Sequence, residues 1–223
     1  MRTLTLILTA LLTSVTLRAQ EHVSFPTQDG GVVFADVYGK GDRGVVLAHG
    51  GRFTKESWSS QARTLDQAGF LVVAIDFRGR GQSHGGTGLR AGDEGFRFDV
   101  LAAVRYLRSR DARTISVVGA SFGGSAAAEA SAESKPSEID RIVLLGAYAD
   151  EPEKLKGRKL FIVARDDAND DGPRLPKIQA SYEKAPEPKE LIILEGSAHA
   201  QFLFQTDQGD RLMREILRFL SAP

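Results

Sequence analysis

Residues 114–130 have the sequence TISVVGASFGGSAAAEA, in which Gly119-Ala120-Ser121-Phe122-Gly123 matches the pattern G-x-S-x-G. The residues before the pattern suit a buried strand, and the small residues after it suit a helix that packs closely on a sheet. Glycines permit the tight turn between the two and leave the serine hydroxyl exposed at the top of the sheet. The stretch therefore predicts a nucleophilic Ser121, and the alternative is a serine that only caps the helix.

Strand-like and helix-like segments alternate through the rest of the chain. Two short segments, 23–27 and 32–38, flank Asp29-Gly30-Gly31 and predict an antiparallel hairpin. Continuous apolar runs, which suit strands buried on both faces, occupy 44–48, 70–77, 115–118, 142–145, 160–164 and 191–194. Helical spacing occupies 57–68, 94–110, 122–134, 173–185 and 209–220. This order predicts an α/β fold: a mainly parallel sheet with an antiparallel start and helices on both faces.

One short connection limits the size of any segment that could cover the reactive residues. Reactive residues of such a sheet lie in loops at the carboxyl ends of the strands. The link from 147 to 159 barely has room for a crossover helix, so we expect no cap domain.

Composition narrows the functional classes. Lys plus Arg and Asp plus Glu both number 29, so the formal net charge is zero and nucleic-acid binding is disfavoured. Cysteine is absent from the sequence, which excludes disulfides, thiolate nucleophiles and zinc–thiolate sites. We expect a small-molecule partner, while the oligomeric state stays open.

The first 19 residues have the composition of a secretory signal peptide. Arg2 is followed by an uncharged, apolar or hydroxylic stretch at 4–17, which Arg18 and Glu21 end. The stretch is short for a transmembrane anchor, which is the alternative. We therefore predict a signal peptide at 1–19, a single domain at 20–223, export to a periplasm or the medium, and no membrane contact after removal of the signal.

Three further motifs accompany the serine pattern. Leu47-Ala48-His49-Gly50-Gly51 ends a predicted strand, the loop 76–83 has the pattern D-x-R-G-x-G-x-S, and Gly196-Ser197-Ala198-His199 follows the last predicted strand. With these motifs the chain resembles the α/β-hydrolase family, in particular its lid-less serine esterases and dienelactone-hydrolase-like members. The resemblance covers nearly all of residues 20–223 and implies the same fold as the strand–helix pattern.

A serine hydroxyl needs an adjacent base to act as a nucleophile at neutral pH, and histidine suits that task. The chain has four histidines. His22 lies near the expected mature terminus, His49 belongs to the His-Gly motif, and His84 lies in a glycine-rich loop. His199 follows the last apolar run, so we predict it as the general base of Ser121.

A carboxylate should orient that histidine, and it should follow the strand at 160–164. The family's frequent G-x-x-D spacing, with Ala164 in the glycine place, implies Asp167 for this role. Three other acids remain alternatives: Asp166, Asp150 and Asp170.

The same loop allows a competing interpretation. Residues 167–172 fit the first half of a calcium-loop pattern, D-x-N-x-D-G, but Ile178 stands where a bidentate glutamate belongs. A looser calcium site and a solvated turn remain alternatives, and the prediction is that no metal and no other cofactor is required.

The resemblance also implies the groups that bind the reacting oxyanion, which are the backbone N–H groups of Gly51 and Phe122. Arg52 is a candidate for binding a substrate carboxylate or carbonyl, and a solvated surface charge is the alternative. Four aromatic residues are candidates either for the substrate pocket or for the core. They are Phe53, Trp58, Phe202 and Phe204.

These residues predict a serine hydrolase that cleaves carboxylic esters of small or medium size through an acyl-enzyme. A peptidase, a thioesterase or a dienelactone-type hydrolase on the same fold is the closest alternative, because a triad does not name the leaving group. A catalytically silent binding protein is the alternative from another class.

Overall fold

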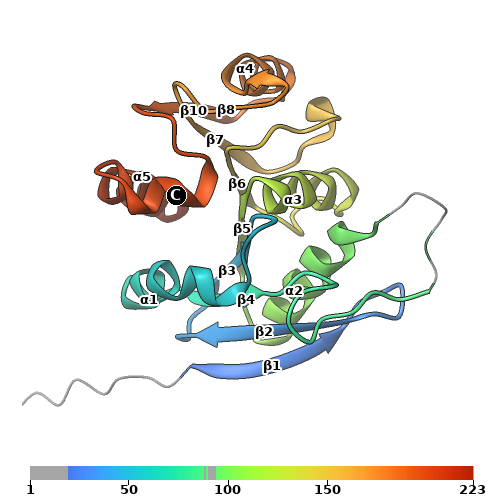
Figure 1. Ribbon diagram of the computed structural model, residues 1–223. Coiled ribbons are helices and arrows are strands. Elements are labelled where there is room, and N and C mark those ends of the chain that lie inside the picture. The colour runs from blue at the N-terminus through green and yellow to red at the C-terminus, as the bar shows by residue number, and fades with distance from the viewer. Residues whose placement is uncertain (1–19, 88, 90–93, 223) are drawn as a thin grey trace, which may run out of the picture.

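The chain forms a central β-sheet with helices on both of its faces (Figure 1). The computed structural model describes residues 20–87, 89 and 94–222. In these residues an eight-stranded sheet has the order β1-β2-β4-β3-β5-β6-β7-β10. Its strands are β1 (Glu21–Pro26), β2 (Val32–Tyr38), β3 (Arg43–Ala48), β4 (Leu71–Ile75), β5 (Thr114–Ala120), β6 (Arg141–Leu145), β7 (Arg158–Ala164) and β10 (Lys189–Leu194).

The sheet is mainly parallel. β2 pairs antiparallel with β1 and with β4, whereas the neighbouring strands from β4 to β10 pair in parallel. The central parallel strands are buried on both faces, which explains their continuous Val, Ile and Leu content. The predicted α/β class, with its antiparallel start, is confirmed.

Two hydrophobic cores lie on opposite faces of the sheet. Figure 1 shows α1 (Ser59–Gln67) and α5 (Gly209–Ser221) on one face, where Leu65 and Phe219 are buried. The other face is covered by α2, α3 and α4, and Leu107 and Ala127 belong to its core. These helices span Phe96–Ser109, Phe122–Glu133 and Leu175–Lys184.

Glycines allow α3 to approach the sheet at the G-x-S-x-G turn. A Cβ atom on Gly123 would lie 2.4 Å from the carbonyl oxygen of Ala48, and one on Gly119 would lie 2.3 Å from the carbonyl oxygen of Gly123. Real Cβ atoms do not come so close to backbone atoms, because the two atoms would overlap and repel each other. Both glycines are therefore needed for the contact between α3, β5 and the end of β3.

Several local elements differ from the sequence-based expectation. The helix expected at 57–68 is a 3-10 turn, η1 (Lys55–Trp58), followed by α1. A second 3-10 helix, η3 (Ala200–Gln205), and a two-stranded hairpin of β8 (Ala168–Asn169) and β9 (Gly172–Pro173) were not expected. Between β6 and β7 the chain forms only the short helix η2 (Pro152–Lys154), so no domain is inserted there, as predicted.

Arg78 of the D-x-R-G-x-G-x-S loop connects three parts of the fold. Its guanidinium donates hydrogen bonds to Asp99 in α2 at 2.7 Å and to Asp29 in the β1–β2 turn at 2.8 Å. Burial alone would raise the pKa of Asp29, but hydrogen bonds from Arg78 and Thr27 lower it to about 2. Burial raises the pKa of Asp99, although the ion pair with Arg78 opposes that shift. This arginine therefore fixes the loop after β4 against the first hairpin.

The signal peptide predicted at 1–19 lies outside the described residues, so it and the predicted export stay predictions. Among the helices of the described residues, none has the length and apolar content needed to cross a bilayer.

Candidate active site

Ser121, His199 and Asp167 are joined by two short hydrogen bonds. The Nε2 atom of His199 lies 2.7 Å from the Oγ atom of Ser121, and its Nδ1 atom lies 2.7 Å from the Oδ2 atom of Asp167. Asp167 is completely buried, and the His199 side chain is 26% exposed. The structure thus brings the three residues together from loops far apart in the sequence.

The backbone of Ser121 is held in a rarely populated conformation. Its φ is 50° and its ψ is −119°, and Ser121 directly precedes α3. A non-glycine residue with positive φ costs roughly 1–3 kcal/mol and persists only where its surroundings impose it. Here the N–H of Ser121 donates to the carbonyl of Leu145, and its own carbonyl accepts from Gly124 and Ser125. These contacts hold the hydroxyl outside the helix, toward His199.

The register of the sheet brings the loops together. Ala48 of β3 aligns with Gly119 of β5, and Ala164 of β7 aligns with Leu194 of β10. The four strands are parallel members of one sheet, so the loops that follow them meet at its carboxyl edge. This is the edge at which the sequence predicted the reactive residues.

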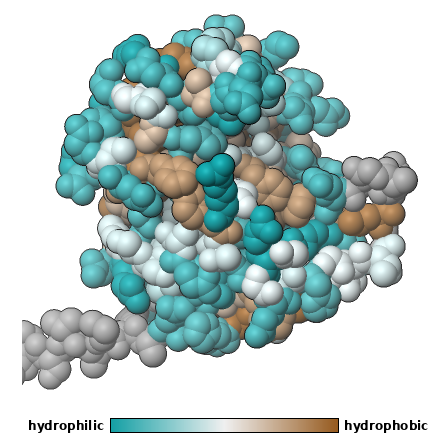
Figure 2. Space-filling model, viewed as in Figure 1, coloured by the Kyte–Doolittle hydropathy of each residue, from teal (hydrophilic) through white to brown (hydrophobic). Residues whose placement is uncertain are grey.

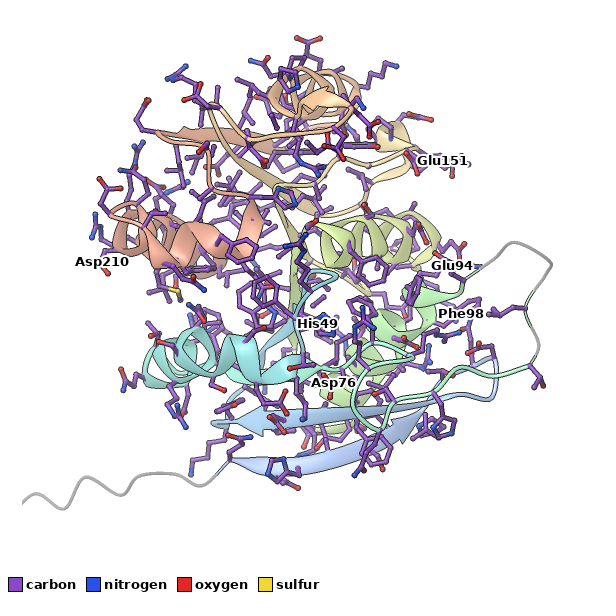
Figure 3. All side chains as sticks on the ribbon, in the orientation of Figure 1. His49, Asp76, Glu94, Phe98, Glu151 and Asp210 are labelled. Carbon is purple, nitrogen blue, oxygen red and sulfur yellow. The ribbon has the colours of Figure 1, made fainter. Side chains whose placement is uncertain are left out.

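Among the four histidines, His199 is the one that contacts Ser121. His49 is fully buried, its Nδ1 bonds to the Gly50 carbonyl at 2.8 Å, and its Nε2 accepts from the Phe77 N–H at 3.2 Å. Burial lowers the pKa of His49, so the ring stays neutral. Figure 3 labels His49 and Asp76 near the centre of the molecule, where β3 and β4 end. The other two histidines, His22 and His84, are exposed.

Of the candidate acids, Asp167 is the one that reaches His199. Asp166, Asp150 and Asp170 are exposed, whereas Asp167 is buried at the start of the β8–β9 hairpin. Its carboxylate contacts His199 and also Arg174, whose Nε lies 3.4 Å from Oδ1. Asp167 is the first residue of the calcium-loop pattern, and its carboxylate is therefore already engaged by His199, which lies outside that loop.

Gly51 and Phe122 face each other beside Ser121. A Cβ atom on Gly51 would lie 3.8 Å from the Cβ of Phe122, and both residues line the same pocket as Ser121. Phe122 is the first residue of α3, so its N–H has no partner within the helix. The structure therefore places the two residues predicted to bind the oxyanion next to each other in this pocket.

Gln201 connects the loop after β3 to the loop after β10. Its Oε1 accepts a hydrogen bond from the Gly50 N–H at 2.7 Å, and its Nε2 donates to the Ser57 hydroxyl at 2.9 Å. The side chain is buried. Gln201 thus fixes the residue before Gly51 relative to His199, a role that sequence reasoning did not identify.

The three residues open into a pocket of about 390 Å³. It is lined by Gly50, Gly51, Arg52, Phe53, Ser121, Phe122, Ala168, Arg174, His199, Ala200, Gln201 and Phe202. Phe53 and Phe202 contact each other with ring centroids 5.0 Å apart. Trp58 and Phe204 instead pack together at 5.8 Å, and neither lines this pocket. Figure 2 shows hydrophobic side chains across the middle of the molecule, between α5 and α3.

The comparison with protein families agrees with this architecture. Residues 44–209 match the family described as alpha/beta hydrolase fold, which is most of the chain. The chain belongs to this family. Solved structures superpose closely: an esterase from Pyrococcus furiosus has a TM-score of 0.75 at 19% identity, covering 96% of this chain and 94% of its own. A bromoperoxidase from Bacillus anthracis has a TM-score of 0.72 at 17% identity, covering 91% and 100%.

Two curated relatives match over part of their length. The non-heme haloperoxidase of Rhodococcus erythropolis is 33% identical over 119 residues, which are 53% of this chain and 42% of that protein. The AB hydrolase superfamily protein YisY of Bacillus subtilis is 27% identical over 137 residues, which are 60% and 45%. The chain spans less than half the length of these curated relatives.

Proposed function

We propose that the chain is a serine hydrolase that cleaves carboxylic esters of small or medium size through an acyl-enzyme. The observation that carries this proposal is the 2.7 Å contact between the Nε2 of His199 and the Oγ of Ser121. A serine hydroxyl becomes nucleophilic when a neutral imidazole within hydrogen-bond reach can accept its proton.

The carboxylate of Asp167 sets the direction of proton transfer. It accepts a hydrogen bond from the N–H at Nδ1 of His199, which leaves the lone pair of Nε2 facing the Ser121 hydroxyl. Ser121 then attacks the ester carbonyl and its proton moves to Nε2. The backbone N–H groups of Gly51 and Phe122 stabilise the oxyanion that forms.

Collapse of that intermediate completes the first half of the reaction. His199 returns the proton to the departing alkoxide, and an acyl group remains on Ser121. A water molecule gives a proton to His199 and attacks the acyl-enzyme. His199 then passes that proton to the Oγ of Ser121 as the acid is released. Both halves use the same three side chains.

We expect esters with short acyl chains to be the better substrates. The pocket of about 390 Å³ lies at the small end of ligand sites, and the short β6–β7 connection adds no apolar cover. The measurement is kcat/KM for p-nitrophenyl esters from acetate to palmitate. Faster hydrolysis of palmitate than of butyrate esters contradicts the assignment of substrate size.

Labelling with a fluorophosphonate separates this function from its alternatives. We expect one equivalent of label on Ser121 together with turnover of the short esters. Labelling without ester turnover favours an amide or thioester substrate, and absence of labelling favours a binding protein that retains the fold.

Gln201→Leu is expected to lower kcat for p-nitrophenyl acetate by about 10- to 100-fold. The change leaves the Gly50 N–H without its acceptor and frees the residue next to Gly51, and small displacements of catalytic groups cost about 10²-fold. The matched control is Gln205→Leu, at an exposed position of η3. Equal kcat for the two variants contradicts the positioning role.

A further inference from the structure

Arg174 is held in the pocket wall by the same hairpin that carries Asp167. Its backbone N–H donates to the Asp167 carbonyl at 2.8 Å, across the β8–β9 hairpin, and the residue directly precedes α4. The position of the guanidinium is thus linked to the position of the carboxylate that contacts His199.

The hydrogen-bonding capacity of Arg174 is largely unused. Its Nε lies 3.4 Å from Oδ1 of Asp167, but both atoms are buried and lack a hydrogen-bond partner in the described residues. No described residue accepts a hydrogen bond from its two terminal nitrogens either. The side chain is one quarter exposed and lines the pocket. The donors of an arginine form a rigid fork that matches a carboxylate. The two terminal nitrogens of Arg174 are therefore available to an anionic ligand.

A second arginine lines the same pocket. Arg52 follows Gly51, is exposed, and has no ion pair or hydrogen bond with any described residue. No Asp or Glu is among the lining residues of this pocket, and the carboxylate of Asp167 behind it is already engaged by His199. Two arginines line the pocket and the single carboxylate of Asp167 lies behind it, so cations outnumber anions and the local potential is positive, although the chain as a whole has no net charge.

Arg174 is connected to Ser121 through only two other side chains, so its positive charge lies close to the reacting atoms. Arg174 touches Asp167, Asp167 bonds to His199, and His199 bonds to Ser121. An anion on Arg174 therefore lies within one small substrate's length of the carbonyl that Ser121 attacks. Phe53 and Phe202 supply an apolar surface for the uncharged part of such a substrate.

We propose that the pocket is selective for esters that carry a carboxylate in the same small molecule, with Arg174 as the specificity-determining residue and Arg52 as a second cationic contact. This inference rests on the proposed esterase function. It names the substrate class: monoesters of short dicarboxylic acids and esters of similar shape and charge.

The test compares two esters that differ in charge. Monoethyl glutarate and ethyl pentanoate have acyl chains of the same length, and the first carries a carboxylate where the second has a methyl group. Hydrolysis of both is followed by pH-stat titration. We expect the wild-type protein to prefer monoethyl glutarate in kcat/KM, and the preference to shrink at high ionic strength.

Arg174→Gln is expected to lower the ratio of kcat/KM for monoethyl glutarate to kcat/KM for ethyl pentanoate by about 10- to 100-fold, through a higher KM for monoethyl glutarate, because a charge-assisted hydrogen bond is lost. Arg174→Lys should restore part of the preference. Arg52→Gln changes an exposed side chain, so it tests the same charge with little risk to folding, and we expect a smaller rise in KM. Arg113→Gln is the control, since that side chain is 84% exposed and precedes β5 at the opposite edge of the sheet.

The outcomes separate the inference from the function on which it rests. Equal loss of kcat for both esters in Arg174→Gln means that Arg174 only positions Asp167, and it overturns the inference. Hydrolysis of ethyl pentanoate without preference for the anionic ester overturns the inference and leaves the esterase function standing. Hydrolysis of neither ester by the wild-type protein overturns both.

Discussion

Ser121→Ala is expected to lower the hydrolysis of p-nitrophenyl acetate by four to six powers of ten, which is the range found when the nucleophile of a serine triad is removed. The variant lacks the oxygen of the proposed acyl-enzyme, whereas the pocket and the backbone N–H groups of Gly51 and Phe122 remain. Residual turnover then reflects attack by water in a site that still binds the ester. The measurement is kcat on purified protein, together with loss of fluorophosphonate labelling.

The control for this variant is Ser125→Ala, one helical turn further along α3. The carbonyl of Ser121 accepts the backbone N–H of Ser125, and Ser125 does not line the active-site pocket. We expect wild-type activity in the control. The strained backbone at residue 121 is common to the wild type and Ser121→Ala, so their melting temperatures should be similar. Activity within tenfold of wild type in Ser121→Ala excludes Ser121 as the nucleophile.

The local structure around Ser121 could be predicted from the sequence. The turn around Ser121 depends on residues within a few positions of it, since Gly119 and Gly123 permit the close contact between strand and helix. The buried strands could be recognised because a parallel sheet covered on both faces needs continuous apolar runs. The order of these elements then determined which loops meet at the carboxyl edge.

The parts that depend on contacts between distant segments could not be predicted. Gln201 acts on Gly50, 151 positions earlier in the chain, and neither residue type indicates the pairing. Arg174 reaches Asp167 through a small hairpin whose strands have two residues each. Such short strands have no hydrophobic period to detect.

The sequence also could not show which aromatic residues line the pocket and which belong to the core. Phe53 and Trp58 lie five positions apart, and either could have been assigned to the pocket or to the core. In the structure Phe53 lines the pocket, whereas Trp58 is 1% exposed and packs on Phe204. Trp58 ends the 3-10 turn of η1 and belongs to the hydrophobic core on the face covered by α1 and α5. Sequence composition does not reveal that turn.

Asp167→Asn is expected to lower kcat by about 10⁴-fold while the fold and the binding of the ester are retained. The amide can donate a hydrogen bond to Nδ1 of His199, which favours the tautomer with its proton on Nε2. That tautomer donates to Ser121 and cannot accept its proton, so the nucleophile is not activated. The change also removes the negative charge that stabilises the imidazolium formed during the reaction.

Asp166→Asn is the matched control, because the two aspartates are neighbours and differ in burial and contact. Asp166 is exposed, and its side chain makes no hydrogen bond or ion pair with the described pocket residues, whereas Asp167 is buried against His199. We expect nearly unchanged kcat for Asp166→Asn and much slower fluorophosphonate labelling for Asp167→Asn, since labelling also needs an activated Ser121. The reverse result, with activity lost in Asp166→Asn and kept in Asp167→Asn, would mean that the loop after β7 adopts a different arrangement during turnover and that Asp166 orients the imidazole.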